Sequence, residues 1–261
     1  MARVRPVAHD DRLTLVEHLD ELRTRIIIAI AAFVVAFGVC FWQNHELLDL
    51  LNDPLPNGRE PLTLSVTEPF VTTMTVSVYA ALLISLPIIL YQLYAFVLPA
   101  FSPSERRVAL PLLMLVPVLF IGGVVFGYFV VLGPAVHFLL NFNENQFNIQ
   151  VRARDYYSFV TMTLLAMGII FQIPMGILAV TRLGIATPRQ LRQWRRYAYL
   201  AIAVVAALLP SVDPVSMLIE MVPLIILFEL SIVMASLFGQ PGGRTAPSAP
   251  SAEGSGQAAG G

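Results

Sequence analysis

Six apolar segments follow one another along this chain of 261 residues, and they constrain its fold more than any other feature. Only 13% of the residues are charged and 57% are hydrophobic, whereas a soluble domain carries about 25% charged residues. A chain with so few polar groups cannot cover a globular surface with them, so lipid must cover much of it. A bilayer core about 30 Å thick is crossed by about 20 helical residues. The sequence therefore predicts an all-α polytopic membrane protein, with apolar segments at about residues 26–42, 70–98, 108–140, 156–181, 198–210 and 215–237.

The segments differ in length, and the fifth is the shortest. Residues 197–210 are fourteen residues, or about 21 Å of helix at about 1.5 Å per residue, which falls short of the bilayer. Pro210-Ser-Val-Asp-Pro214 then turns the chain before the sixth segment. The second and third segments are longer and contain prolines such as Pro87 and Pro134, so we expect them to tilt or bend. We predict six transmembrane helices; the alternative for the last two segments is one re-entrant hairpin.

Arginine is distributed unevenly over the segments that connect the predicted helices. With the N-terminus inside, thirteen arginines are cytoplasmic and three, Arg59, Arg152 and Arg154, are outside. Cytoplasmic connections carry the excess of basic residues, so both termini are predicted to be cytoplasmic. We expect residues 1–238 to form one six-helix transmembrane domain and residues 239–261, rich in Gly, Pro, Ser and Ala, to be a disordered tail. The net charge of −1 does not indicate a nucleic-acid partner.

Acidic side chains gather on the cytoplasmic side, next to predicted helix starts. Thr14-Leu-Val-Glu17, Ser102-Pro-Ser-Glu105 and Thr187-Pro-Arg-Gln190 are all capping boxes. Carboxylates near the membrane surface, at Glu17, Asp20, Glu21 and Glu105, favour a site for a cationic ligand, because guanidinium groups bind carboxylates through paired hydrogen bonds. The spacing leaves a structural alternative open: Glu105 caps its own helix, and Glu21 pairs with Arg25 four residues on.

Polar residues inside the predicted spans are a second group of candidates, because such residues are costly in lipid. Gln172 lies midway along the fourth segment and Glu220 near the start of the sixth. Gln172 has the alternative of bridging two helices, and Asp213 at the preceding turn has the alternative of capping the sixth helix. Gly123 and Gly127 are spaced for close helix packing.

The sequence contains no motif for catalysis or for metal binding. It has no His-Glu-x-x-His, no Gly-x-Ser-x-Gly and no P-loop, and its four histidines are scattered. We therefore expect no enzyme activity, no metal and no cofactor.

Seven motifs, in order from about Leu15 to Phe238, resemble the TatC family of the twin-arginine translocase. The first two are His18-Leu-Asp-Glu-Leu-Arg-Thr-Arg25 and Pro87-Ile-Ile-Leu-Tyr-Gln-Leu-Tyr-Ala-Phe-Val-Leu-Pro99. The others are Ala-Phe-Ser-Pro-Ser-Glu-Arg-Arg107, Tyr128-Phe-Val-Val131, Phe171-Gln-Ile-Pro174, Pro210-Ser-Val-Asp213 and Phe228-Glu-Leu230. No single motif is specific, but their order together with the hydropathy pattern is.

The resemblance implies a function that the residues alone do not supply. It implies a receptor in the bacterial cytoplasmic membrane that binds the Arg-Arg signal peptides of folded precursor proteins at its cytoplasmic face. Its partners would be small single-span TatA- or TatB-like proteins, in a homo- or hetero-oligomer, with export driven by the protonmotive force. The implied fold is a glove-like cup of six helices, the fifth and sixth short. Glu21, Glu105, Arg23 and Phe96 match the family's recognition surface, to which we add the neighbouring Asp20.

The chain departs from the family pattern at two polar positions. Many members carry glutamate where this chain has Gln172, and glutamine cannot titrate, so a role in partner binding or packing is expected there instead of proton transfer. Some members have glutamine at the place of Met217, and Glu220 is a candidate replacement contact for a partner helix. The competing hypothesis is a small-solute secondary transporter that uses Glu220 and Gln172 as its buried site.

Overall fold

The computed structural model describes residues 15–56, 60–97, 103–142, 145–146, 149–182, 185–208 and 214–238, without the side chains of 15–17, 103–112, 208 and 216. The described part is almost entirely helical, as predicted, and includes one isolated bridge between Leu62 and Arg152. The tail predicted after residue 238 lies outside the described residues. The helices are α1 (Leu15–Trp42), α2 (Asn44–Asn52), α3 (Glu68–Val97), α4 (Pro103–Phe126), the π-helix η3 (Gly127–Leu132), α5 (Gly133–Asn141), α6 (Ala153–Ile170), α7 (Ile173–Arg182), α8 (Pro188–Gln193), α9 (Arg195–Leu208) and α10 (Pro214–Phe238).

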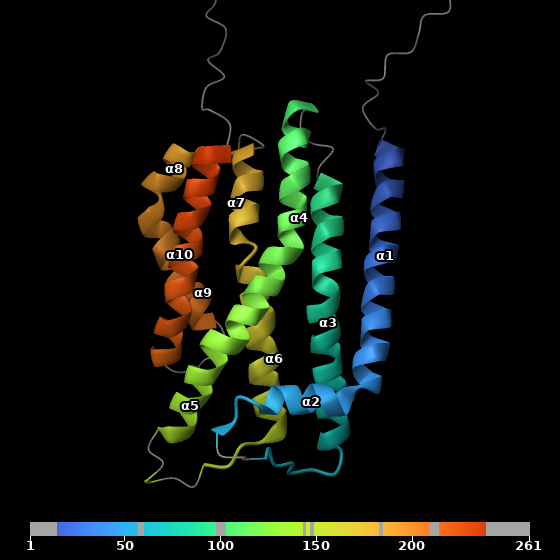
Figure 1. Cartoon of the computed structure of the whole chain (residues 1–261), viewed down its shortest axis with the longest axis vertical. Coiled ribbons are helices and arrows are strands. Elements are labelled where there is room, and N and C mark those ends of the chain that lie inside the picture. Colours follow the sequence, from blue (N-terminus) through green and yellow to red (C-terminus); the bar gives the residue numbers. More distant parts are fainter. Residues whose placement is uncertain are drawn as a thin grey trace, which may run out of the picture.

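The long helices run up and down one bundle, with α2 lying across one end (Figure 1). We call this the α2 end; at the opposite, α8 end, α1 begins and α10 finishes (Figure 1). Five segments among the described residues are long and apolar enough to cross a membrane: His18–Trp42, Glu68–Val97, Leu113–Asn141, Ala153–Arg182 and Met217–Leu237. A polytopic membrane protein, as predicted, is the fold that follows from these lengths.

The last two helices are only partly as expected. As predicted, α9 is short, with 14 residues, and it packs beside α10 as a separate helix. The prediction that the sixth helix is short is wrong, because α10 has 25 residues and continues through Pro223. The apolar sequence after Pro214 is long enough to sustain a full span, and a proline inside a membrane helix is tolerated when neighbouring groups satisfy the freed carbonyl.

The fourth membrane segment is interrupted where a proline requires it. α6 ends at Ile170 and α7 begins at Ile173, with Pro174 just inside α7. A proline at position 174 has no N–H to donate to the carbonyl of residue 170, and its ring clashes with that carbonyl. The Phe171 N–H still bonds to the Met167 carbonyl oxygen, four residues back, at 3.0 Å, but the Gln172 N–H bonds to the Ile169 carbonyl oxygen, only three residues back, at 2.9 Å. The break places Gln172 at a bend inside the bundle.

Helices α4 and α6 pack closely because each has a glycine facing the other helix. A Cβ atom added at Gly123 would lie 2.7 Å from the Met167 carbonyl oxygen and 2.8 Å from Phe171 Cβ. A Cβ added at Gly168 would lie 2.5 Å from the Phe120 ring. The close packing predicted from Gly123 and Gly127 is therefore confirmed.

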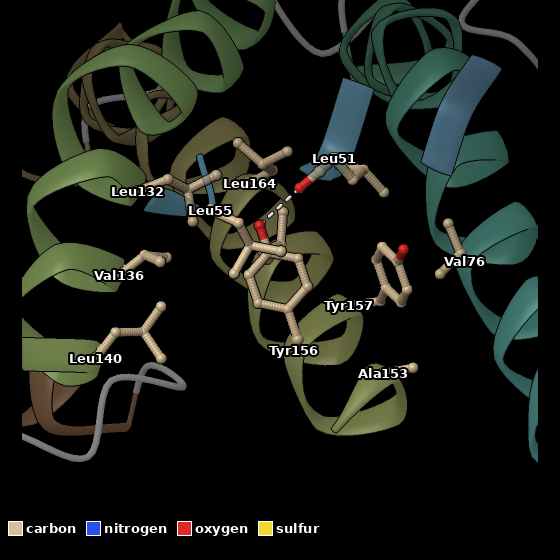
Figure 2. Close-up of a cluster of buried hydrophobic side chains, with 11 residues drawn as sticks. Leu51, Leu55, Val76, Leu132, Val136, Leu140, Ala153, Tyr156, Tyr157 and Leu164 are labelled. Atoms are coloured by element: carbon tan, nitrogen blue, oxygen red, sulfur yellow. Dashed lines mark hydrogen bonds between the residues drawn. The ribbon is translucent and has the colours of Figure 1, made fainter. Parts of the chain in front are cut away.

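Three tyrosines hold the end of α2 against the bundle. The last four carbonyls of a helix have no partner within it. The Tyr128 hydroxyl donates to the Leu50 carbonyl oxygen at 2.8 Å, the Tyr156 hydroxyl to the Leu51 carbonyl oxygen at 2.7 Å, and the Tyr157 hydroxyl to the Asn52 side chain at 2.9 Å. Figure 2 shows the Tyr156 bond amid buried side chains from α2, η3, α5 and α6. Neither α2 nor these bonds were predicted from the sequence.

We expect Tyr156→Phe to lower the free energy of unfolding by about 1–3 kcal/mol, the usual cost of leaving a buried polar group without its partner. The ring would still fill its place in the cluster, so the loss isolates the hydroxyl. The measurement is thermal unfolding in detergent, with Tyr91→Phe on the exposed face of α3 as control. Equal stability of the two variants would mean that the α2 carbonyl needs no tyrosine.

Candidate functional site

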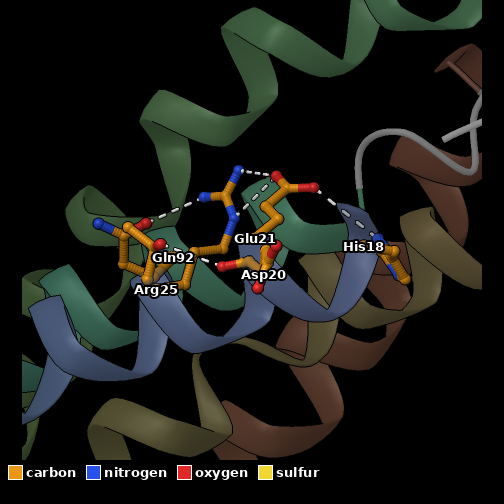
Figure 3. A network of polar contacts seen from close by, with 6 residues as sticks. His18, Asp20, Glu21, Arg25 and Gln92 are labelled. Carbon is orange, nitrogen blue, oxygen red and sulfur yellow. Dashed lines mark hydrogen bonds and ion pairs between the residues drawn. The ribbon is translucent and has the colours of Figure 1, made fainter. Parts of the chain in front are cut away.

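The candidate site lies at the α8 end, where the start of α1 meets the last turns of α3 (Figure 1). Residues three or four apart share one face of a helix, so His18, Glu21 and Arg25 all face α3. Arg25 Nε and one terminal nitrogen both donate to Glu21 Oε1, at 3.0 and 2.5 Å. The other terminal nitrogen donates to Gln92 Oε1 on α3 at 2.9 Å (Figure 3). The pair between Glu21 and Arg25, which the sequence left open as an alternative, is thus formed, and Arg25 also bonds to a second helix, α3.

An aromatic contact closes the same junction one turn nearer to the helix start. The rings of His18 and Phe96 are stacked, with centroids 4.3 Å apart and an angle of 12° between their planes. Phe96 is half-buried by this contact. The stack fixes the end of α3 against α1 and places the His18 ring beside Glu21.

Glu21 keeps one oxygen for another partner. Both bonds from Arg25 end on Oε1, while Oε2 lies 3.8 Å from His18 Nδ1, too far for a hydrogen bond. The Glu21 side chain is 27% exposed. An ionised carboxylate accepts about four hydrogen bonds. The internal pair therefore leaves Glu21 accessible and able to bind a further cation.

The other predicted recognition residues are not all brought to this point. Asp20 and Arg23 are exposed on α1. Arg23 lies two residues from Glu21, hence about 200° away around the helix. Glu105 lies in the first turn of α4, also at the α8 end, but its side chain, like that of Glu17, is outside the described part of the chain. Glu21 and Phe96 are thus joined through His18, whereas Arg23 faces elsewhere.

Of the three capping boxes, Thr187 shows the complete arrangement. Its hydroxyl accepts from the Gln190 N–H, and the Gln190 side chain accepts from the Thr187 N–H at 2.8 Å. Pro103 is the first residue of α4, as predicted, while Thr14 and Ser102 lie outside the described residues.

Gln172 bridges two membrane segments. It is 7% exposed, and its amide donates to the Val116 carbonyl oxygen on α4 at 3.1 Å. Its Oε1 has no partner among the described residues. Gln172 thus bridges two helices, which is the structural alternative that the sequence left open.

The polar residues of the last helix have separate environments. Glu220 is fully buried, so its side chain does not reach the outer surface of the chain, while Met217 is partly buried and Asp213 lies outside the described residues. Glu229 accepts hydrogen bonds from Arg195 at 2.5 Å and from the Tyr199 hydroxyl at 2.6 Å, which ties α10 to α9. Within the described residues, no group of three His, Cys, Asp or Glu side chains is placed to hold a metal ion.

The contacts of Gln92 and of Phe96 were not predicted from the sequence. Gln92 lies 67 residues from Arg25, so no local spacing connects them. The signal for His18 in the sequence is its spacing, three residues before Glu21 and seven before Arg25, which puts it on their face of α1.

Comparison with known proteins decides the family. Residues 17–223 match the family model described as Sec-independent protein translocase protein (TatC). The chain belongs to the TatC family. The TatC protein of Aquifex aeolicus is 34% identical over 230 residues, which cover 86% of this chain and 95% of that protein. The TatC protein of Halothiobacillus neapolitanus is 33% identical over 225 residues, 85% of this chain but only 62% of that longer protein.

A solved structure agrees with this assignment. The crystal structure of the twin arginine translocase receptor TatC in DDM superposes with a TM-score of 0.75 at 34% identity, covering 84% of this chain and 99% of that one. As a member of the TatC family, the chain is a multi-pass membrane protein and a component of a Sec-independent protein translocase.

Proposed function

We propose that the chain is a receptor for Arg-Arg signal peptides, with its binding site at the α8 end and Glu21 as the principal ligand for a guanidinium group. The observation that carries the proposal is the Glu21 carboxylate, which is ionisable, 27% exposed and hydrogen-bonded through only one of its oxygens. Glu105, in the first turn of α4 at the same end, is the proposed second carboxylate. Phe96 and Asp20 complete the proposed surface, whereas Arg23 points away from Glu21 and is left out of it.

The α8 end is proposed to face the bacterial cytoplasm. The sequence assigns thirteen of the sixteen arginines to the cytoplasmic side, where membrane proteins carry their excess of basic residues, and α8 with Arg189 and Arg192 lies at this end (Figure 1). Both α1 and α10 have their outer chain ends there, as an even number of passes requires (Figure 1). In this orientation α2 and its tyrosines lie on the far side of the membrane.

The translocase would be completed by small single-span TatA- or TatB-like partners and driven by the protonmotive force. Met217, which is partly exposed on α10, is the proposed partner contact, whereas Gln172 is assigned to packing because its side chain is buried and its amide already bonds to the α4 backbone. A direct role for Glu220 requires a partner helix to reach a fully buried side chain, so we assign it to the interior. No structural observation favours the alternative of a small-solute transporter, since the Gln172 amide bonds to the α4 backbone.

Peptide binding tests the proposal. Glu21→Gln should weaken binding of an Arg-Arg signal peptide about 10- to 100-fold, because a hydrogen bond to a charged group contributes about 1.5–3 kcal/mol. Binding of a fluorescent peptide to the purified full-length protein in detergent gives the dissociation constant. Glu46→Gln, an exposed carboxylate on α2 at the opposite end, is the matched control and should bind like the unaltered protein.

Two further measurements make the result specific. A peptide with Lys-Lys in place of Arg-Arg should bind more weakly and lose less on Glu21→Gln, because lysine cannot form paired bonds to a carboxylate. Unchanged binding in both Glu21→Gln and Glu105→Gln would overturn the site.

A further inference from the structure

We propose that Arg25 is an internal competitor of the signal peptide: its guanidinium occupies Glu21 in the unliganded protein and lowers the affinity of the site. The inference rests on the proposed function and adds the residue that limits how tightly the site binds. It follows from where the Arg25 side chain lies, pairing a partly exposed carboxylate with the same chemical group that the ligand presents (Figure 3).

The geometry of Arg25 is that of a bound ligand on one carboxylate oxygen. Two of its nitrogens donate to Glu21 Oε1, at 3.0 and 2.5 Å, so a guanidinium that binds both carboxylate oxygens must displace them. The pair is partly buried, with Arg25 21% and Glu21 27% exposed. Because the two residues are four apart on one helix, their pair contributes little to the stability of that helix, so a ligand can displace it without disrupting the fold.

Gln92 offers Arg25 a hydrogen-bond acceptor that remains after Arg25 leaves Glu21. The bond from Arg25 to Gln92 Oε1 comes from the terminal nitrogen that does not touch Glu21. This bond can persist while the other two are lost, so the displaced guanidinium is not left without an acceptor. The charge of Arg25 also acts before displacement, because it neutralises Glu21 and repels an approaching guanidinium.

Arg25→Gln distinguishes a competitor from a positioning residue. If Arg25 competes, its removal should tighten binding of the Arg-Arg peptide about 1.5- to 5-fold, the equivalent of the 0.2–1 kcal/mol typical of a partly exposed pair. If Arg25 instead holds Glu21 in its binding orientation, the same change weakens binding. Arg192→Gln, which removes one exposed arginine from α8 at the same end, controls for net charge and should leave the dissociation constant unchanged.

The gain must also depend on Glu21. In the Glu21→Gln background, Arg25→Gln should give no tightening, since there is no carboxylate left to release. Where Arg25→Gln does not elute as a folded protein, Arg25→Lys serves instead: it keeps the charge but loses the fork, and a smaller gain is expected.

The outcomes separate this inference from the function on which it rests. If the unaltered protein binds no Arg-Arg peptide, the proposed function fails. If it binds and Glu21→Gln weakens binding, but Arg25→Gln has no effect or weakens binding too, the receptor stands and the competitor is overturned. A gain that persists in the Glu21→Gln background also overturns it, because the gain then reflects net charge alone.

Discussion

Gly123→Ala is expected to lower the free energy of unfolding by about 3 kcal/mol, the upper end of the usual cost of overpacking a protein interior. Gly122→Ala, one residue earlier on the same helix, should be neutral or slightly stabilising. The added methyl at position 123 would lie 2.7 Å from a backbone oxygen of α6, whereas at position 122 nothing lies within 4 Å.

The contrast is strong because the obstacle at position 123 is backbone. A clash with the end of a flexible side chain is relieved by a rotamer change, but the Met167 carbonyl oxygen moves only if α6 moves. α6 is buried along much of its length by α3 and α4, so the two helices would have to separate. Close-packed interiors do not accommodate that without losing other contacts.

The two alanine variants form their own control. Both gain the same intrinsic helix preference of alanine over glycine, about 1 kcal/mol, so the difference between them measures the clash alone. The measurement is thermal unfolding of both purified variants in the same detergent, together with their accumulation in membranes. Equal stability would show that α4 and α6 are not packed as closely as described.

The parts of this fold that the sequence predicted are those that a single segment determines. The membrane helices followed from the length of apolar runs, because lipid leaves a spanning backbone no partner other than itself. The pair between Glu21 and Arg25 was among the alternatives because a spacing of four residues fixes it. The same holds for the capping box at Thr187 and for the close packing at Gly123.

The parts that escaped prediction depend on residues far apart in the chain. Gln92 completes the Arg25 contacts from 67 residues away, and Tyr156 caps α2 from 105 residues away. No periodicity links such residues; only the packing of α1 on α3 and of α2 on α6 brings them together. The pair of Glu21 with Arg25 was thus predictable from the sequence, but the contacts of Gln92 with Arg25 and of Phe96 with His18, which tie this pair to α3, were not.

Arg152→Met is expected to lower the melting temperature more than any other single change at the α2 end. Arg152 donates two hydrogen bonds to Glu68, from Nε to Oε1 at 2.8 Å and from a terminal nitrogen to Oε2 at 3.3 Å. Glu68 is only 5% exposed, so without the guanidinium its charge would be left in a site poorly reached by water. These bonds also raise the pKa of the Arg152 guanidinium, which therefore stays charged throughout the test.

The Arg152–Glu68 pair links the segment before α3 to the segment before α6, which are also linked by backbone hydrogen bonds. The Leu62 N–H bonds to the Val151 carbonyl oxygen at 2.7 Å, and the Ala153 N–H bonds to the Leu62 carbonyl oxygen at 2.8 Å. Glu68 adds an acceptor for the Leu64 N–H at 2.9 Å. Loss of Arg152 should thus loosen the chain between α2 and α3 as well as the start of α6.

Which partner is removed decides the size of the effect. Glu68→Gln should cost less than Arg152→Met, because the amide still accepts a hydrogen bond and Arg152, at 39% exposure, keeps contact with water. The double variant should be more stable than Arg152→Met alone, since it leaves no buried charge. Arg154→Met, which removes an exposed arginine two residues away, should leave the melting temperature unchanged. If Arg152→Met and Arg154→Met melt together, the pair contributes nothing.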